Sequence, residues 1–345
     1  MQKLICLLAA LAAAGRRLPA QQLEALWYST GATRSTESFL ANASHISIVS
    51  PQVFSFDNEG AIHGRLDKRL VDTARAKGVK LVPLVVNPGF SQPLIHRILN
   101  VAPVRKRAIE SLVALCRDQH LDGIQFDIEN VNVVDKNAFT SFVRDASARL
   151  HAANCSVSAA VVPRVGEDPG PSAYHKWIFE NWRGAYDYKA LAASLDFLSY
   201  MTYAQHTGGT PPGPVAGYPW MEECLQYVLS LGVPPSKISL GIPSYSDHWF
   251  ASYDPANGGG ARSKAGDSEF SKIDSLLRTF QVTPVWDDRE KSSYAFWSNA
   301  GVFEHVWIED ARAFSAKLEL VRKYKLRGYS VWVLGTEDPR VWELR

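Results

Sequence analysis

The stretch LDGIQFDIEN, Leu121–Asn130, alternates apolar and polar residues with a period of two, which predicts a buried β-strand. Side chains at positions i, i+2 and i+4 of a strand project from one face, about 7 Å apart per step. Gln125, Asp127 and Glu129 therefore share a face. A solvated strand with chance acids is the plain interpretation, but acids crowded on a core-facing side are costly unless they are hydrogen-bonded or used, so the pairing favours a functional site.

Strand-like and helix-like segments alternate on both sides of this stretch, which is typical of βα repetition around a parallel sheet. Amphipathic segments at 65–77, 104–119, 137–153, 221–231 and 311–324 are expected to be helices. Eight strands separated by helices predict a TIM (β/α)8 barrel of the α/β class. The expected strands are 24–29, one within 45–56, 80–87, 121–130, 156–162, 195–203, 238–245 and 328–334.

The segment 249–310 departs from this alternation, and we expect it to be a small α+β insertion between the seventh strand and its helix. It contains the run Gly258–Gly260, a helix-like piece at 270–279, and two strand-like pieces at 294–298 and 303–307. The Asn-Ala-Gly sequence at 299–301 between the two strands fits a hairpin turn. Such an insertion would form a wall of the site, because barrel active sites lie at the C-terminal ends of the strands.

The 345 residues are 46% hydrophobic and 21% charged, as in an ordinary globular protein. The net charge is +2 and the Lys and Arg residues are dispersed, so nothing favours binding to nucleic acid. Ten Trp, thirteen Tyr and fifteen Phe suit either a core or stacking against sugar rings, and composition does not separate the two.

The N-terminal residues 1–20 combine Lys3, an apolar run over 4–14, and a small residue, Ala20, where a peptidase could cut. We interpret them as a signal peptide, with a short uncleaved anchor as the alternative, and expect residues 21–345 to form a catalytic barrel that is secreted or periplasmic and not membrane-bound. The remaining cysteines, Cys116, Cys155 and Cys224, are odd in number and lack CxxC spacing. This favours buried free thiols over a disulfide framework or a zinc site, although one disulfide is left open.

The residues of the central stretch carry a family resemblance. DGIQFDIE, 122–129, is similar to the DGxDxDxE signature of glycoside hydrolase family 18, the chitinase family. Tyr200–Tyr203 resembles the family's MxY element, and Gly328–Trp332 resembles the segment that ends in the tryptophan beneath the sugar. The resemblance covers essentially the whole chain after residue 20. Further segments, at 50–51, 83–87, 185–188 and 306–312, resemble the subgroup of spore cortex-lytic N-acetylglucosaminidases and chitobiase-like enzymes.

The resemblance implies substrate-assisted catalysis, in which the 2-acetamido oxygen of the substrate is the nucleophile. Glu129 would be the general acid and base, Asp127 would hold the acetamido group, Tyr203 would donate its hydroxyl to the acetamido oxygen, and Trp332 would stack beneath the sugar. Tyr203 and Trp332 could instead be ordinary core aromatics. The remaining candidate substrate-binding residues are Gln125, Met201, Tyr245 and Asn87.

Several points of the site stay open at the level of sequence. Tyr245 fits core packing as well as a sugar contact, and Asn87 fits a loop cap as well as a substrate contact. Gln125 stands where the family has its middle aspartate, and a neutral amide at this position can still donate a hydrogen bond to Asp127. Ala204 replaces an aspartate after the strand-six tyrosine, which would alter affinity, pH optimum or substrate.

The sequence therefore predicts a retaining glycosidase for β-linked N-acetylglucosamine glycans, either peptidoglycan fragments or chitooligosaccharides. A catalytically inactive, lectin-like glycan-binding protein of the same fold is the alternative, and an endoglycosidase acting on glycoproteins is a third hypothesis. No metal or other cofactor is expected, because the residues show no third ligand beside Asp247-His248. The expected partner is an N-acetylglucosamine-containing oligo- or polysaccharide, bound by a monomer.

Overall fold

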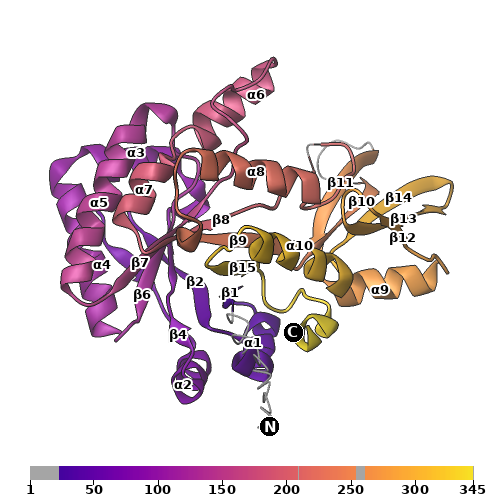
Figure 1. The fold of residues 1–345 in the computed structure, drawn as a ribbon, viewed down its shortest axis with the longest axis horizontal. Helices are drawn as coiled ribbons and strands as arrows, with labels where there is room; N and C mark the ends of the chain where they lie inside the picture. Colours follow the sequence, from indigo (N-terminus) through magenta and orange to yellow (C-terminus); the bar gives the residue numbers. More distant parts are fainter. Residues whose placement is uncertain (1–22, 209, 254–260, 345) are drawn as a thin grey trace, which may run out of the picture.

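The computed structural model describes residues 23–208, 210–253 and 261–344. The expected signal peptide and the Gly258–Gly260 run lie outside the described residues. Eight parallel strands form a closed barrel, because β1 pairs with β15 on one side and with β2 on the other (Figure 1). The predicted TIM barrel is confirmed. The barrel strands are β1 Glu24–Ser29, β2 Ile48–Phe56, β5 Leu84–Val86, β6 Gly123–Asp127, β7 Ser156–Val161, β8 Phe197–Tyr200, β9 Ile238–Pro243 and β15 Gly328–Trp332.

Two shorter strands extend the sheet beside β2. The strand expected at 80–87 is interrupted, so that β4 (Lys80–Leu81) and β5 each pair with β2. The strand β3 (Ile62–Gly64) adds an antiparallel hairpin that the residue pattern does not predict.

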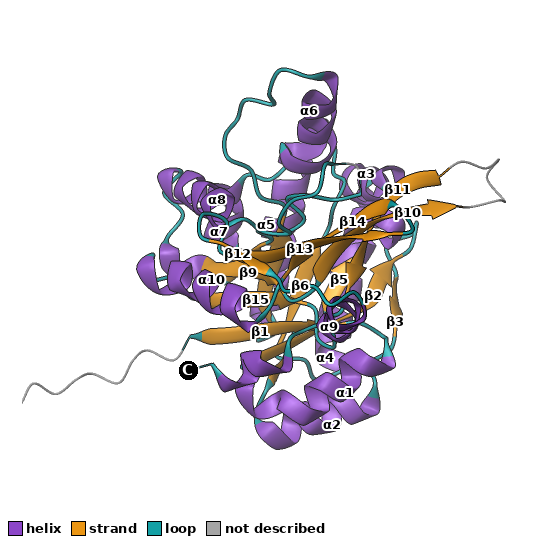
Figure 2. Ribbon diagram, turned by 90° about the vertical axis from the view of Figure 1, so that its right-hand side faces the viewer, coloured by secondary structure: helices purple, strands orange, loops and turns teal. Residues whose placement is uncertain are grey.

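Helices surround the barrel and cover the outer faces of its strands (Figures 1 and 2). Phe126 of β6 points outward and its ring meets that of Phe142 at 6.0 Å, whereas Gln125 and Asp127 point inward. Gly78 ends α2 with a φ of 68°, as expected for a glycine at a helix C-terminus. The helices are α1 Thr33–Asn42, α2 Lys68–Lys77, α3 Gln92–Asn100, α4 Ala102–Asp118, α5 Lys136–Ala152, α6 Ala173–Ile178, α7 Tyr188–Ser194, α8 Tyr218–Ser230 and α10 Ala311–Lys323.

The expected insertion is a second, antiparallel sheet of five strands with one helix, placed between β9 and α10. Figure 1 shows it beside the barrel, in orange and yellow. The sheet begins at Ser246, three residues earlier than expected, and only two of its strands are predicted by the sequence. Its elements are β10 Ser246–Tyr253, β11 Ala261–Ser268, α9 Phe270–Thr279, β12 Val285–Asp287, β13 Ser292–Asn299 and β14 Val302–Ile308.

The expectation of free thiols is wrong for two of the three cysteines. Cys116 of α4 and Cys155, just before β7, form a disulfide with Cα atoms 6.5 Å apart, whereas Cys224 is free and buried. The two partners are 39 residues apart in the chain. They meet because α4 and β7 both pack beside β6, and their spacing in the sequence carries no trace of this neighbourhood.

Candidate active site

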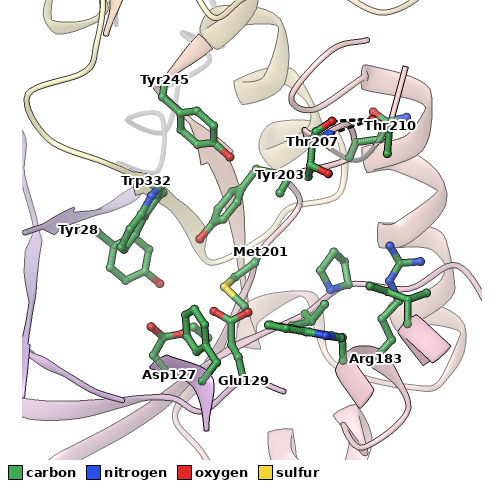
Figure 3. A pocket seen from close by; sticks show the side chains of 18 of the residues that line it. Tyr28, Asp127, Glu129, Arg183, Met201, Tyr203, Thr207, Thr210, Tyr245 and Trp332 are labelled. Carbon is green, nitrogen blue, oxygen red and sulfur yellow. Dashed lines mark hydrogen bonds between the residues drawn. The ribbon is translucent and has the colours of Figure 1, made fainter. Parts of the chain in front are cut away.

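A cavity of about 490 Å³ opens at the C-terminal ends of the barrel strands. This volume is within the usual range for small-molecule sites, about 300–1,000 Å³. Its walls are mainly aromatic, and Asp127 and Glu129 are the carboxylates that line it (Figure 3). The aromatic lining residues are Tyr28, Phe90, Tyr174, Trp177, Trp182, Tyr203, Trp220, Tyr245 and Trp332.

Asp127 is the last residue of β6, and Glu129 follows two residues later, so both carboxyl groups reach the cavity from one strand. The two carboxyl groups lie close enough for each to shift the pKa of the other. The side-chain amide of Gln52 donates a hydrogen bond to Oδ2 of Asp127, at 3.1 Å. Oδ1 of Asp127 is buried and receives no hydrogen bond from an amide or hydroxyl of the described residues.

Burial sets the protonation of this pair. It raises the pKa of Asp127 to about 6, against the hydrogen bonds from Gln52 and Glu129, which lower it. The pKa of Glu129 lies well above its usual range, because burial, the charge of Asp127 and the hydrogen bond to Asp127 all disfavour its ionised form. The proton of the pair is therefore held by Glu129, which is the protonation that a general acid requires.

Asn87 holds the backbone of Glu129 from behind. Its Nδ2 donates to the carbonyl oxygen of Glu129 at 2.9 Å, and its Oδ1 accepts from the amide nitrogen of Glu129 at 3.1 Å. Asn87 is fully buried and does not line the cavity. The structure thus shows a positioning contact between Asn87 and Glu129, together with a hydrogen bond from Nδ2 to the carbonyl oxygen of Ser91 in the following loop at 3.4 Å, and a substrate contact of Asn87 stays a prediction.

Gln125 lies one layer deeper in the barrel, two residues before Asp127 on the same strand face. Its Oε1 accepts from the hydroxyl of Tyr28 at 2.6 Å, and its Nε2 donates to Oγ of Ser158 at 2.9 Å. The hydrogen bond that an amide at this position could donate to Asp127 is not formed, because residues i and i+2 of a strand lie too far apart for it. Gln52 of β2 supplies that hydrogen bond, and Gln125 does not line the cavity.

The other predicted site residues come together from three strands. Met201 and Tyr203 follow β8, Tyr245 follows β9, and Trp332 ends β15; all four line the cavity (Figure 3). Burial is the main reason why the pKa of Tyr203 lies well above its usual range, so its hydroxyl keeps its proton as a hydrogen-bond donor.

Neither Ala204, which replaces the family's aspartate, nor the next residue replaces the carboxylate of that aspartate. Ala204 has a φ of 55° and offers no polar side chain to the cavity. Gln205, the next residue, lines the cavity, but its Oε1 already accepts from the amide nitrogen of Gly217 at 2.7 Å.

Several lining residues were not predicted from the sequence. Tyr28 packs against Trp332 with ring centroids 5.5 Å apart, and Gln52 contacts Asp127. Tyr28 lies near the C-terminal end of β1 and Gln52 in the middle of β2, and both strands are predicted by the sequence. Others lie on the segment between β7 and α7, which includes Trp177 and Arg183, and a further group lies in and after β5 and between β8 and the first turn of α8. A loop rich in Pro and Gly gave no signal for them.

Among the described residues, no group of three or more His, Cys, Asp or Glu side chains is placed to hold a metal ion. Over the same residues, no helix has the length and apolar character needed to cross a bilayer.

Comparison with known proteins gives consistent matches over most of the chain. The family model described as "Glycosyl hydrolases family 18" matches residues 21–337. An uncharacterized glycosylase, YvbX, of Bacillus subtilis is 25% identical over 92% of this chain and 88% of its own length. A cortical fragment-lytic enzyme of the same organism is 29% identical over 75% of this chain and 57% of its own length.

Solved structures agree with these matches. The spore cortex-lytic enzyme SleL of Bacillus megaterium superposes with a TM-score of 0.81 at 26% identity, over 93% of this chain and 73% of that chain. A chitinase of Chromobacterium violaceum superposes with a TM-score of 0.82, also at 26% identity, over 93% of this chain and 97% of that chain.

Proposed function

The chain belongs to glycosyl hydrolases family 18 and is therefore a glycoside hydrolase, and we propose that it is a secreted, retaining enzyme for β-linked N-acetylglucosamine glycans. The observation that carries the proposal is the pair of buried carboxyls, Asp127 and Glu129, in a cavity with many aromatic side chains, where the raised pKa of Glu129 keeps the proton on that residue. Bound sugar rings would use the aromatic walls, since their C–H faces are apolar.

In the proposed first step, the acetamido oxygen of the bound sugar attacks the anomeric carbon as the glycosidic bond breaks. Glu129 gives its proton to the departing oxygen, and Asp127 holds the acetamido N–H and stabilises the positive charge that develops on the oxazolinium intermediate. Asp127 lines the cavity beside Glu129, which places it where this contact would form.

In the proposed second step, water attacks the anomeric carbon and Glu129 takes its proton, which restores both groups. Two displacements at the same carbon retain the β configuration. Tyr203 would donate its hydroxyl to the acetamido oxygen, and Trp332 and Met201 would form the walls around the sugar.

The proposed substrates are peptidoglycan fragments, ahead of chitooligosaccharides. Support comes from the two relatives whose names refer to the spore cortex, while the chitinase match keeps chitin-derived glycans in view. Secretion is supported by the N-terminal pattern of residues 1–20 and by the Cys116–Cys155 disulfide, a bond that persists in oxidising compartments.

Product analysis by mass spectrometry tests the proposal, using chitooligosaccharides, peptidoglycan fragments and N-glycans with determination of the released anomer. Release of a β-configured product carrying N-acetylglucosamine at its new reducing end is expected. An α-configured initial product would contradict the acetamido mechanism. Binding of these glycans without any product would instead support the lectin-like alternative, which Ala204 and Gln125 motivate.

A further inference from the structure

Arg183 stands out among the residues that line the cavity. In the described part of the chain, Arg183 is the only Lys, Arg or His that lines the cavity. The other ionisable side chains of the lining are the two carboxyls and the tyrosines. Its side chain is half-buried and forms no hydrogen bond or ion pair among the described residues, although its charge acts on the buried thiol of Cys224 and lowers the pKa of that thiol against the effect of burial. A guanidinium at the edge of an aromatic cavity without a partner of its own is a ready site for an anion on the ligand.

The backbone around Arg183 is held firmly by a second arginine. Arg183 ends the π-helical turn Phe179–Arg183, and its carbonyl oxygen accepts a hydrogen bond at 2.8 Å from the guanidinium of Arg164. Arg164 is buried, also donates to the carbonyl of Tyr186 at 2.9 Å, and lies over the ring of Tyr188 at 4.5 Å. These hydrogen bonds fix the main chain at Arg183, so the starting point of its side chain is held in place at the cavity.

The place of Arg183 relative to the two acids indicates which sugar it would meet. Figure 3 shows Arg183 on the side of the cavity away from Trp332 and Tyr28, with Glu129 and Met201 between them. Trp332 would carry the sugar whose acetamido group reacts, and Glu129 would protonate the bond to the next sugar. Arg183 therefore lies on the side of the leaving group.

We propose that Arg183 is a specificity-determining residue that binds the lactyl carboxylate of N-acetylmuramic acid in the leaving-group position. This inference rests on the proposed function. N-acetylmuramic acid differs from N-acetylglucosamine only by its 3-O-lactyl group, so one carboxylate separates a peptidoglycan substrate from a chitin-like one. A planar guanidinium binds a carboxylate with two parallel hydrogen bonds, which gives direction as well as charge.

Binding through Arg183 requires a lactyl group with a free carboxylate. A lactyl group that carries a peptide is an amide and has no charge, whereas a free lactyl group is a carboxylate. The enzyme would thus prefer glycan from which an amide hydrolase has already removed the peptide. A reaction of that class must precede this one.

The test compares three disaccharide substrates: N-acetylglucosamine linked β-1,4 to N-acetylglucosamine, to N-acetylmuramic acid, and to the lactyl carboxamide of N-acetylmuramic acid. For the unaltered protein, kcat/KM is expected to be about tenfold or more higher for the carboxylate than for the carboxamide, since a charged hydrogen bond is lost. In Arg183→Met this ratio should fall to about one, and Arg183→Lys should keep part of it because the charge remains without the planar fork. Lys176→Met is the matched control, since Lys176 is an exposed cation of α6 that does not line the cavity, and it should leave the ratio unaltered.

Binding supplies a readout that does not depend on turnover. Calorimetry on Glu129→Gln, alone and combined with Arg183→Met, should show the same carboxylate preference and the same loss. A ratio near one in the unaltered protein, or a ratio that survives Arg183→Met, would overturn the inference while hydrolysis of any of the disaccharides leaves the proposed function intact. Absence of turnover with a carboxylate preference in binding would reject the hydrolase proposal and keep the Arg183 site.

Discussion

Two buried carboxyl groups, Asp127 in the barrel mouth and Glu309 beside the second sheet, share a raised pKa but differ in their partners. Glu309 forms an ion pair with Lys317 of α10, and both side chains are almost completely buried. Ser292 of β13 donates to Glu309 at 3.4 Å and accepts from Lys317 at 3.5 Å. Burial still raises the pKa of Glu309 to about 7, although the charge of Lys317 acts in the opposite direction. Glu309, Lys317 and Ser292 thus bind one another, and they connect the second sheet to the barrel helix α10.

The pair of Asp127 and Glu129 lacks such a cation. Among the described residues, the neutral amide of Gln52 donates to Asp127, Tyr28, Tyr186 and Tyr203 lie near both acids, and no Lys, Arg or His forms an ion pair with either acid. A lysine here would lower both pKa values and take away the proton of Glu129. A buried acid that pairs with a cation, such as Glu309, stabilises the fold. A buried acid whose charged neighbour is another acid, such as Glu129, keeps a proton that it can transfer.

The largest expected effect follows from removing that transferable proton. Glu129→Gln should lower kcat on N-acetylglucosamine glycans by about 100- to 10,000-fold, because general acid catalysis contributes that much. Initial rates by chromatography of the products measure the loss. Glu180→Gln is the matched control, a half-exposed acid that does not line the cavity, and should retain full activity. Full activity in Glu129→Gln would remove Glu129 from its proposed role.

The second expected effect concerns the matched pair. Lys317→Met leaves Glu309 buried without its cation and should lower the free energy of unfolding by about 3–5 kcal/mol at pH 8. The loss should shrink at pH 5, where Glu309 takes a proton, and Glu309→Gln added to Lys317→Met should restore part of the stability. Urea unfolding curves at the two pH values measure this. An equal loss at both pH values would mean that packing, and not the unpaired charge, causes it.

The sequence was sufficient for the barrel and for the strand that carries the acids. Alternation in residues 121–130 predicts β6 and places Asp127 on its inner face, and the rhythm of strands and helices predicts the closed architecture. Met201, Tyr203, Tyr245 and Trp332 line the cavity because each follows or ends a predicted barrel strand. Their individual roles stay predictions.

What the sequence did not reveal depends on contacts between distant segments. Gln52 reaches Asp127, and Asn87 reaches the backbone of Glu129, only once neighbouring strands are in register. The Cys116–Cys155 disulfide has the same origin. Arg183 lies on a segment without hydrophobic periodicity. The local sequence therefore predicts neither its position in the cavity nor the absence, among the described residues, of an ion pair with its guanidinium.

The third prediction tests whether Asp127 is costly to the fold. Its pKa in the folded protein, about 6, exceeds its ordinary value of 3.8, so the associated stability is present below pH 3.8 and is lost as the pH rises through 6. Asp127→Asn should therefore raise the free energy of unfolding by about 1–3 kcal/mol at pH 8 and change it little at pH 4. Urea unfolding at both pH values measures the gain. A destabilised Asp127→Asn protein at pH 8 would show that the carboxylate is better satisfied than its burial indicates.

The smallest expected effect is the pH dependence of kcat/KM, which separates the two acids of the cavity from Glu309. The rate should fall as the pH drops through about 6, since Asp127 must be ionised to stabilise the intermediate, and at pH 5 it should be about tenfold below the plateau. It should fall again at higher pH as Glu129 loses its proton. Asp127→Asn should abolish the acidic fall in its residual activity, whereas Lys317→Met, which perturbs only the matched pair, should leave the profile in place. An acidic fall that persists in Asp127→Asn but moves in Lys317→Met would assign the titration to Glu309 and would break the distinction between a structural and a catalytic buried acid.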